Sequence, residues 1–234
     1  MVVAGSIGPT GELIEPLGSM TVPDAIAAFT EQAEGLRAGG ADVAWIETKS
    51  AAEEMRAAAV AAIEVGLPYT VTASFDTAGR TMMGLRPTEL IDVFAELPVA
   101  PIAIGANCGV GASDLRDAIQ QMVADERSTD MVIIATSNCG IPEFKGAEIE
   151  YSGDPLLMGR YATMAVDSGA GIVGGCCGTS PTHLAEMRRR LDAHEAGSAP
   201  TVDDIVESIG PLTNPVATTG DAPARRRRSG RRIS

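Results

Sequence analysis

Residues 169–179 read Gly-Ala-Gly-Ile-Val-Gly-Gly-Cys-Cys-Gly-Thr, an apolar run that passes into a glycine-rich loop carrying two adjacent thiols, Cys176 and Cys177. Adjacent side chains of a regular strand point to opposite faces. Both thiols can therefore contact the same bound atom only where the strand has ended and glycines let the backbone turn. A similar apolar run at residues 101–106 leads into Cys108. The pattern predicts strands that carry thiols at their C-terminal ends.

The rest of the chain alternates in the same way between apolar runs and segments of helical spacing. Start signals for the helices include Thr21, Ser50 and Asp154. Six strand-helix units call for a parallel sheet covered by helices, and a (β/α)8 TIM barrel places its functional residues at the strand ends. A complete barrel takes about 250 residues, so we expect about six of its units in residues 1–196. The expected strands are residues 2–7, 43–46, 69–75, 101–106, 131–135 and 169–173.

Composition limits the classes of function. Of the 234 residues, 45% are hydrophobic, which is enough for one sizeable core, and 18 basic against 31 acidic residues give a net charge of −13. This charge disfavours nucleic-acid binding by the folded body. The sequence has no apolar run of membrane-spanning length and no signal peptide, and its four cysteines form no disulfide-like framework. We therefore expect a cytoplasmic protein with small-molecule partners.

Three of the cysteines form the candidate metal site. Thiolates are ligands that Zn²⁺ prefers, and three of them leave one tetrahedral position open, as in catalytic zinc sites. We predict Zn²⁺ bound by Cys108, Cys176 and Cys177. Buried apolar thiols or a redox-active vicinal pair are the alternatives. Cys139 is expected to be a small buried residue. His183 has no second metal-ligating residue near it in the sequence, so it is not expected to bind the metal.

A resemblance supports the metal assignment. Gly-Ala-Asn-Cys-Gly at residues 105–109 and Gly-Gly-Cys-Cys-Gly-Thr-Ser-Pro at residues 174–181 resemble the zinc signature of the homocysteine S-methyltransferase family. The resemblance covers residues 2–194 and implies that the three cysteines bind zinc, which binds the sulfur of homocysteine. It also implies an eight-stranded barrel whose first two units, with an Asp-Gly motif for the homocysteine amino group, are missing here. We therefore expect a fragment, or a subunit completed by another chain.

Three further residues are candidates for substrate binding. Glu47 follows the apolar run at residues 43–46, and by resemblance it holds the amino-acid part of homocysteine. Asn107 and Asn138 each precede a strand-end loop. A turn role, in which an Asn side chain bonds nearby backbone, is the alternative for both.

The function implied is zinc-dependent methyl transfer to homocysteine sulfur, which gives methionine. The sequence Asn-Cys-Gly-Ile-Pro-Glu-Phe at residues 138–144, with Tyr-Ser-Gly at residues 151–153, most resembles bacterial betaine–homocysteine enzymes, and methionine-synthase modules have a similar sequence there. The chain shows no cobalamin- or folate-binding module, so a direct donor is expected and betaine is favoured. The alternatives are S-methylmethionine as donor, the homocysteine module of a cobalamin-dependent methionine synthase, and a non-catalytic zinc- or thiol-binding barrel fragment.

The C-terminal part differs in composition from the barrel. Residues 201–209 predict a short amphipathic helix, and residues 225–232 carry six arginines among small and polar residues. We expect residues 197–234 to form this helix and a disordered Arg-rich tail, with an arm for acidic surfaces as the alternative. A homo-oligomer or a completing chain is the expected protein partner.

Overall fold

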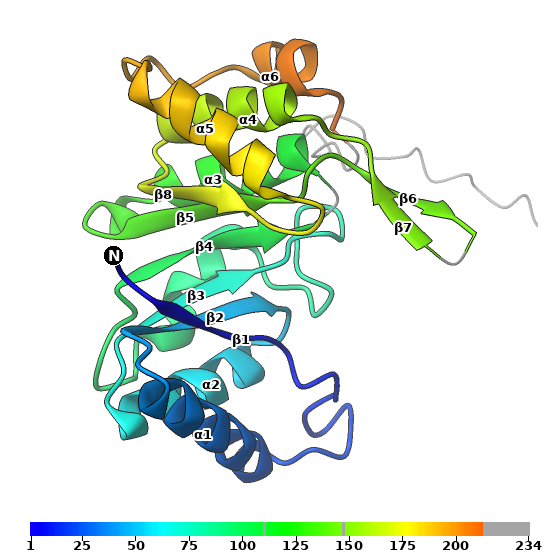
Figure 1. The fold of residues 1–234 in the computed structure, drawn as a ribbon. Coiled ribbons are helices and arrows are strands. Elements are labelled where there is room, and N and C mark those ends of the chain that lie inside the picture. The colour runs from blue at the N-terminus through cyan, green and yellow to red at the C-terminus, as the bar shows by residue number, and fades with distance from the viewer. Residues whose placement is uncertain (110, 147, 213–234) are drawn as a thin grey trace, which may run out of the picture.

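The computed structural model describes residues 1–109, 111–146 and 148–212. Within this part of the chain, six parallel strands form one curled sheet in the order β1-β2-β3-β4-β5-β8, which is part of a TIM barrel (Figure 1). This confirms the predicted α/β class and the count of six barrel strands. The strands are β1 (Ala4–Ile7), β2 (Val43–Lys49), β3 (Tyr69–Ala73), β4 (Ala103–Cys108), β5 (Val132–Ser137) and β8 (Ile172–Gly175).

Helices pack on the outer side of the curled sheet, with α1 and α2 beside β1 and β2 and with α4 and α5 at the β8 end (Figure 1). Between β3 and β4 the predicted helix is replaced by two short 3₁₀ helices, η1 (Pro87–Glu89) and η2 (Ile91–Phe94). A third, η3 (Glu126–Ser128), precedes β5. The α-helices are α1 (Val22–Ala38), α2 (Ala52–Val65), α3 (Ala112–Val123), α4 (Pro155–Asp167), α5 (Pro181–Asp192) and α6 (Val202–Ile209).

The helix starts follow the capping signals in part. Thr21 and Asp154 cap α1 and α4 through their side chains, as predicted. The capping box predicted at Ser50 is wrong, because α2 begins at Ala52 and its N-cap residue is Ala51, whose side chain makes no capping hydrogen bond. Ser50 belongs instead to the loop after β2, where its carbonyl accepts a hydrogen bond of 2.7 Å from the Thr81 hydroxyl.

A β-bulge ends strand β2. Ile46 pairs with Val71 and Lys49 with Ala73, so β2 uses three residues where β3 uses two. Ile46 and Lys49 are consequently both fully buried although they lie an odd number of residues apart. Glu47 and Thr48 therefore lie opposite the single residue Thr72 of β3, near the C-terminal end of the strand. Bulges of this kind redirect side chains near functional sites.

The buried Lys49 joins β2 to α2. Its ammonium donates to the Gly8 carbonyl at 2.6 Å, lies 3.6 Å from the Glu54 carboxylate and sits 4.0 Å from the centre of the Phe29 ring. Glu54 also accepts hydrogen bonds from the backbone and hydroxyl of Thr10. Burial lowers the pKa of Lys49 to about 8, against the attraction of Glu54. This network ties the loop after β1 to the body of the protein.

Two elements lie outside the barrel pattern. An antiparallel hairpin of β6 (Pro142–Lys145) and β7 (Glu148–Tyr151) projects from the C-terminal side of β5 (Figure 1). Helix α6 packs on α3 and α4, and Ile205 and Ile209 are its buried residues. The predicted Arg-rich tail beyond residue 212 lies outside the described residues. Among the described residues, no helix has both the length and the apolar character that a membrane crossing requires.

Candidate metal and substrate site

Three cysteine sulfurs meet at the C-terminal edge of the sheet. Cys108 ends β4, and Cys176 and Cys177 follow β8 directly. The sulfurs of Cys108 and Cys177 are 3.8 Å apart, those of Cys176 and Cys177 are 3.9 Å apart, and all three lie within 4.8 Å of one another. The fold thus brings together the three thiols that the sequence singled out.

The thiols fit a zinc ion. Zinc–sulfur bonds of about 2.3 Å at a tetrahedral angle put neighbouring sulfurs about 3.8 Å apart. The two measured separations, 3.8 and 3.9 Å, match this geometry before any ion is placed. Cys108, Cys176 and Cys177 form the one such group of three metal-ligand residues in the described part of the chain.

The thiols share their protons unequally. A hydrogen bond with Cys176 is the main cause that lowers the pKa of Cys108, whereas the same hydrogen bond and burial raise the pKa of Cys176. The hydrogen bond between the two therefore favours the thiolate form at Cys108 and the thiol form at Cys176. A cation that binds all three sulfurs displaces the protons that they still carry.

Asn138 fixes the two cysteine loops relative to each other. Its amide nitrogen donates to the Gly109 carbonyl at 2.8 Å, and its amide oxygen accepts from the Cys177 backbone N–H at 3.1 Å. The side chain is 2% exposed. The predicted contact with substrate stays a prediction for Asn138, and its described partners are protein groups on either side of the thiols.

Asn107 is fully buried beneath the thiols. Its amide oxygen accepts from the Thr48 backbone N–H and from the Thr72 hydroxyl, both at 2.8 Å. Its amide nitrogen lies 2.7 Å from the Thr48 hydroxyl oxygen and 3.7 Å from the sulfur of Cys176. Its predicted substrate contact likewise stays a prediction.

Glu47 lies in the bulge of β2, beside the first strand. The Ser6 hydroxyl of β1 donates to its carboxylate at 2.5 Å. Thr48, the next residue, has φ of 60°, a strained left-handed conformation for a β-branched side chain. The end of β2 therefore carries both Glu47, the predicted substrate-binding residue, and the strained backbone of Thr48, which contacts from neighbouring groups must stabilise.

Cys139 lies apart from the metal group. Its sulfur is 3.0 Å from the Gly153 carbonyl oxygen and 3.1 Å from Nε2 of His183, and the residue is 1% exposed. The Ser180 backbone N–H donates to Nδ1 of His183 at 3.0 Å, so in the neutral ring Nε2 carries the hydrogen and directs it at the Cys139 sulfur. The structure thus buries Cys139, as expected.

Tyr151 is a further residue at the site, and the sequence motifs did not predict its place there. The residue ends β7, and its ring lies against Gly178, where an added Cβ would come within 2.4 Å of the ring. Burial raises the pKa of Tyr151 to about 12, and a hydrogen bond with Cys177 adds to the shift. The hairpin therefore delivers a phenol to the most exposed of the three thiols. The sequence signal available was the glycine after the cysteine pair, because a side chain at Gly178 would displace the ring.

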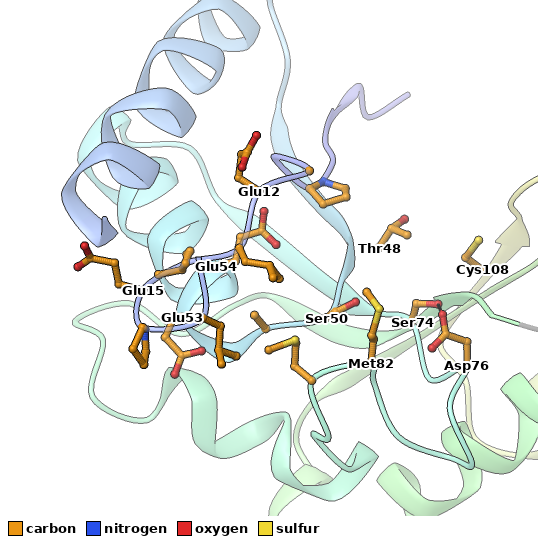
Figure 2. A pocket seen from close by; sticks show the side chains of 18 of the residues that line it. Glu12, Glu15, Thr48, Ser50, Glu53, Glu54, Ser74, Asp76, Met82 and Cys108 are labelled. Carbon is orange, nitrogen blue, oxygen red and sulfur yellow. Dashed lines mark hydrogen bonds between the residues drawn. The ribbon is translucent and has the colours of Figure 1, made fainter. Parts of the chain in front are cut away.

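A cavity of about 500 Å³ opens beside the thiols, and Cys108 and Gly109 form part of its wall (Figure 2). The other walls come from the loop after β1, the bulge of β2 and the start of α2, together with Met82 and Met83. Its acidic lining residues are Glu12, Glu15, Glu53, Glu54 and Asp76. The metal group thus adjoins a cavity that is apolar in part and acidic in charge.

The chain is similar to known proteins in both sequence and fold. Residues 1–191 match the sequence profile of the family described as Homocysteine S-methyltransferase. The apo form of the homocysteine methyltransferase MmuM from Escherichia coli superposes with a TM-score of 0.64 at 21% identity, over 81% of this chain and 63% of that one. Its oxidized form gives a TM-score of 0.59 at 21% identity, over 81% and 61%. The present chain thus spans less than two thirds of the length of that enzyme.

Proposed function

Because the chain belongs to the homocysteine S-methyltransferase family, we propose that it transfers a methyl group from a small cationic donor to the sulfur of homocysteine. The observation that carries the proposal is the group of three cysteine sulfurs, spaced for one metal ion, at the wall of a cavity of about 500 Å³. A metal-held sulfur substrate and its methyl donor then lie side by side.

Cys108, Cys176 and Cys177 would hold Zn²⁺, whose chemistry when bound is to lower the pKa of a substrate thiol so that the thiolate persists at neutral pH. The cysteines and their surroundings supply the rest. Three protein ligands leave a fourth tetrahedral position for a substrate sulfur. Asn138 and the backbone of Ser137, which accepts from the Cys176 N–H at 2.6 Å, hold the cysteine loops in place.

Glu47 is proposed to bind the ammonium group of homocysteine. Its carboxylate lies at the C-terminal end of β2, on the edge of the sheet that carries the thiols. The hydroxyl of Ser6 orients the carboxylate by a short hydrogen bond. A charge-assisted hydrogen bond from an ammonium to this carboxylate would fix the amino-acid end while the sulfur faces the cysteines.

The acidic cavity favours a cationic donor. As the sulfur lone pair forms the new S–CH₃ bond, the donor's bond to its methyl group breaks and the electron pair stays on the departing atom, which loses its positive charge. Carboxylates such as Glu12, Glu15 and Glu53 attract a quaternary ammonium or sulfonium ion and repel an anionic folate. Betaine is the favoured donor, and S-methylmethionine is the second candidate, because each bears the transferable methyl group on a positively charged atom.

The test is methyl transfer measured by product. The zinc-loaded chain is incubated with homocysteine and with methyl-deuterated betaine or S-methylmethionine, and labelled methionine is followed by mass spectrometry. We expect label from one of the two cationic donors and none from methyltetrahydrofolate. Labelled methionine from the folate alone would contradict the donor assignment. Zinc binding without any turnover, also when further strands complete the sheet, would support a non-catalytic zinc-binding role instead.

A matched pair of variants tests the metal ligands. Cys108→Ala removes one of the three grouped thiols, whereas Cys139→Ala removes a buried thiol of the same kind outside the group. We expect about one zinc per chain in the wild type and in Cys139→Ala, and loss of zinc and of methyl transfer in Cys108→Ala, measured by elemental analysis. Full zinc occupancy in Cys108→Ala, or loss in Cys139→Ala, would exclude the assignment.

A further inference from the structure

We propose that Asn107 is a positioning residue that couples the two halves of the site, the β2 bulge with Glu47 and the metal group with Cys176. One side-chain amide, fully buried, contacts both. The role in substrate orientation rests on the proposed function, whereas the two contacts themselves are independent of it.

The first half of the coupling is the bulge. Inserting an extra residue into β2 leaves a backbone N–H without a partner in the ladder, and an unpaired buried N–H is costly. The N–H of Thr48 donates instead to Oδ1 of Asn107 at 2.8 Å. This bond holds Thr48 at φ of 60°, a strained conformation that persists only where its surroundings enforce it. Asn107 therefore sets the direction in which Glu47 leaves the strand.

The second half is the thiol. A backbone N–H only donates, and the Thr72 hydroxyl also lies 2.8 Å from Oδ1, so the oxygen of the Asn107 amide must face these two groups. The NH₂ group then faces the Thr48 hydroxyl at 2.7 Å and the Cys176 sulfur at 3.7 Å. A sulfur that accepts a hydrogen bond is fixed in orientation and carries less charge.

The consequence is that neither half moves without the other. Asn107 precedes Cys108 in β4, so its backbone position is set by the strand while its side chain spans from β2 to the loop after β8. Asparagine suits this place because both of its amide atoms are used. Aspartate would have no N–H to donate to the Cys176 sulfur, and alanine would lose all four contacts.

The test uses readouts that do not need turnover. Asn107→Ala is compared with the wild type for zinc affinity by chelator competition, for the sulfur-to-metal charge-transfer band of the cobalt(II)-substituted protein, and for hydrogen exchange of the Thr48 amide by NMR. We expect zinc affinity to fall about ten- to a hundredfold, the band to shift, and the Thr48 amide to lose its protection. A folded Asn107→Ala protein that is unchanged in all three measurements would overturn the proposal.

A milder pair of variants keeps the test decisive if Asn107→Ala does not fold. Thr72→Val removes one hydroxyl that orients the amide, and Thr70→Val removes a buried hydroxyl that has no hydrogen-bond partner among the described residues and lies two residues away on the same strand. We expect Thr72→Val to shift the cobalt band and weaken zinc binding several-fold relative to Thr70→Val. Identical behaviour of the two would overturn the proposal.

The homocysteine measurement separates this inference from the proposed function. In zinc-saturated protein, we expect Asn107→Ala to weaken homocysteine binding through the displaced bulge. If the wild type binds zinc and no homocysteine, the proposed function is wrong, and the cobalt band and Thr48 exchange still decide the role of Asn107.

Discussion

Substituting Glu47 tests homocysteine binding separately from zinc binding. Glu47→Ala removes the proposed partner of the homocysteine ammonium and leaves the cysteines untouched. We expect homocysteine affinity to fall about ten- to a hundredfold, because the variant loses one charge-assisted hydrogen bond worth about 1.5 to 3 kcal/mol. Titration calorimetry on zinc-loaded protein measures it.

Glu47→Gln is the matched variant, because glutamine still accepts the Ser6 hydrogen bond and lacks the charge. It should bind homocysteine about as weakly as Glu47→Ala while both variants keep their zinc. Unchanged affinity in the zinc-loaded variants would exclude the role.

Among single residues, those that lie in sequence motifs were predictable, and those that only the fold brings together were not. The three cysteines were predictable because glycines mark the strand ends beside them. The partners of Asn107 were not, since Thr48 and Cys176 lie 59 and 69 residues away in the chain. Tyr151 was missed for a similar reason, because only the hairpin brings it to Cys177.

At the scale of elements, the six strands and most helices followed from periodicity and caps, because apolar runs between helical segments specify a parallel sheet. The hairpin of β6 and β7 did not, since it is an insertion between β5 and α4 whose strands have four residues each. The bulge of β2 was also not predictable. The bulge depends on two tertiary contacts: the buried ion pair of Lys49 with Glu54, and the hydrogen bond from the Thr48 N–H to Asn107.

The buried ion pair between Lys49 and Glu54 is expected to stabilise the packing of β2 on α2. Lys49→Met leaves the buried carboxylate of Glu54 without its cation, and breaking a buried ion pair costs about 3 to 5 kcal/mol of unfolding free energy. Urea denaturation measures the loss. The double variant Lys49→Met, Glu54→Met removes both charges and should be more stable than the single one. Glu53→Gln, an exposed neighbour on α2, should change stability by less than about 0.5 kcal/mol.

The pH dependence of the same variant checks the cause. The pKa of Lys49 is 10.5 in the unfolded chain and about 8 in the folded protein. Between pH 8 and 10.5 the unfolded state therefore binds more protons than the folded state. Because of this difference, the unfolding free energy of the wild type rises with pH in this range. The Lys49→Met protein lacks this gain. The stability difference between the two should therefore grow in favour of the wild type from pH 8 to 10.5, and a constant difference would contradict a buried, destabilised ammonium.

At the scale of the whole molecule, the sheet leaves one edge of β1 and one of β8 without a partner strand among the described residues. On β1, Gly5 and Ile7 are buried whereas Ala4 and Ser6 are exposed, so one face of this strand packs on helices and the other lines an open concave side. Unpaired strand edges invite association with other chains, and a closed barrel has none. The open sheet therefore leaves two edges at which further strands can pair.

We accordingly predict that purified residues 1–234 associate or aggregate and transfer methyl groups poorly by themselves. Adding two βα units before β1, by a longer reading frame or by a partner chain, should give a monodisperse protein and restore methyl transfer, because it pairs the edge of β1 and covers the concave side. Light scattering and the labelled-methionine assay measure the two effects. A monomeric, cooperatively unfolding 234-residue chain that turns over homocysteine at about 1 per second or faster would show that the six-stranded sheet is sufficient.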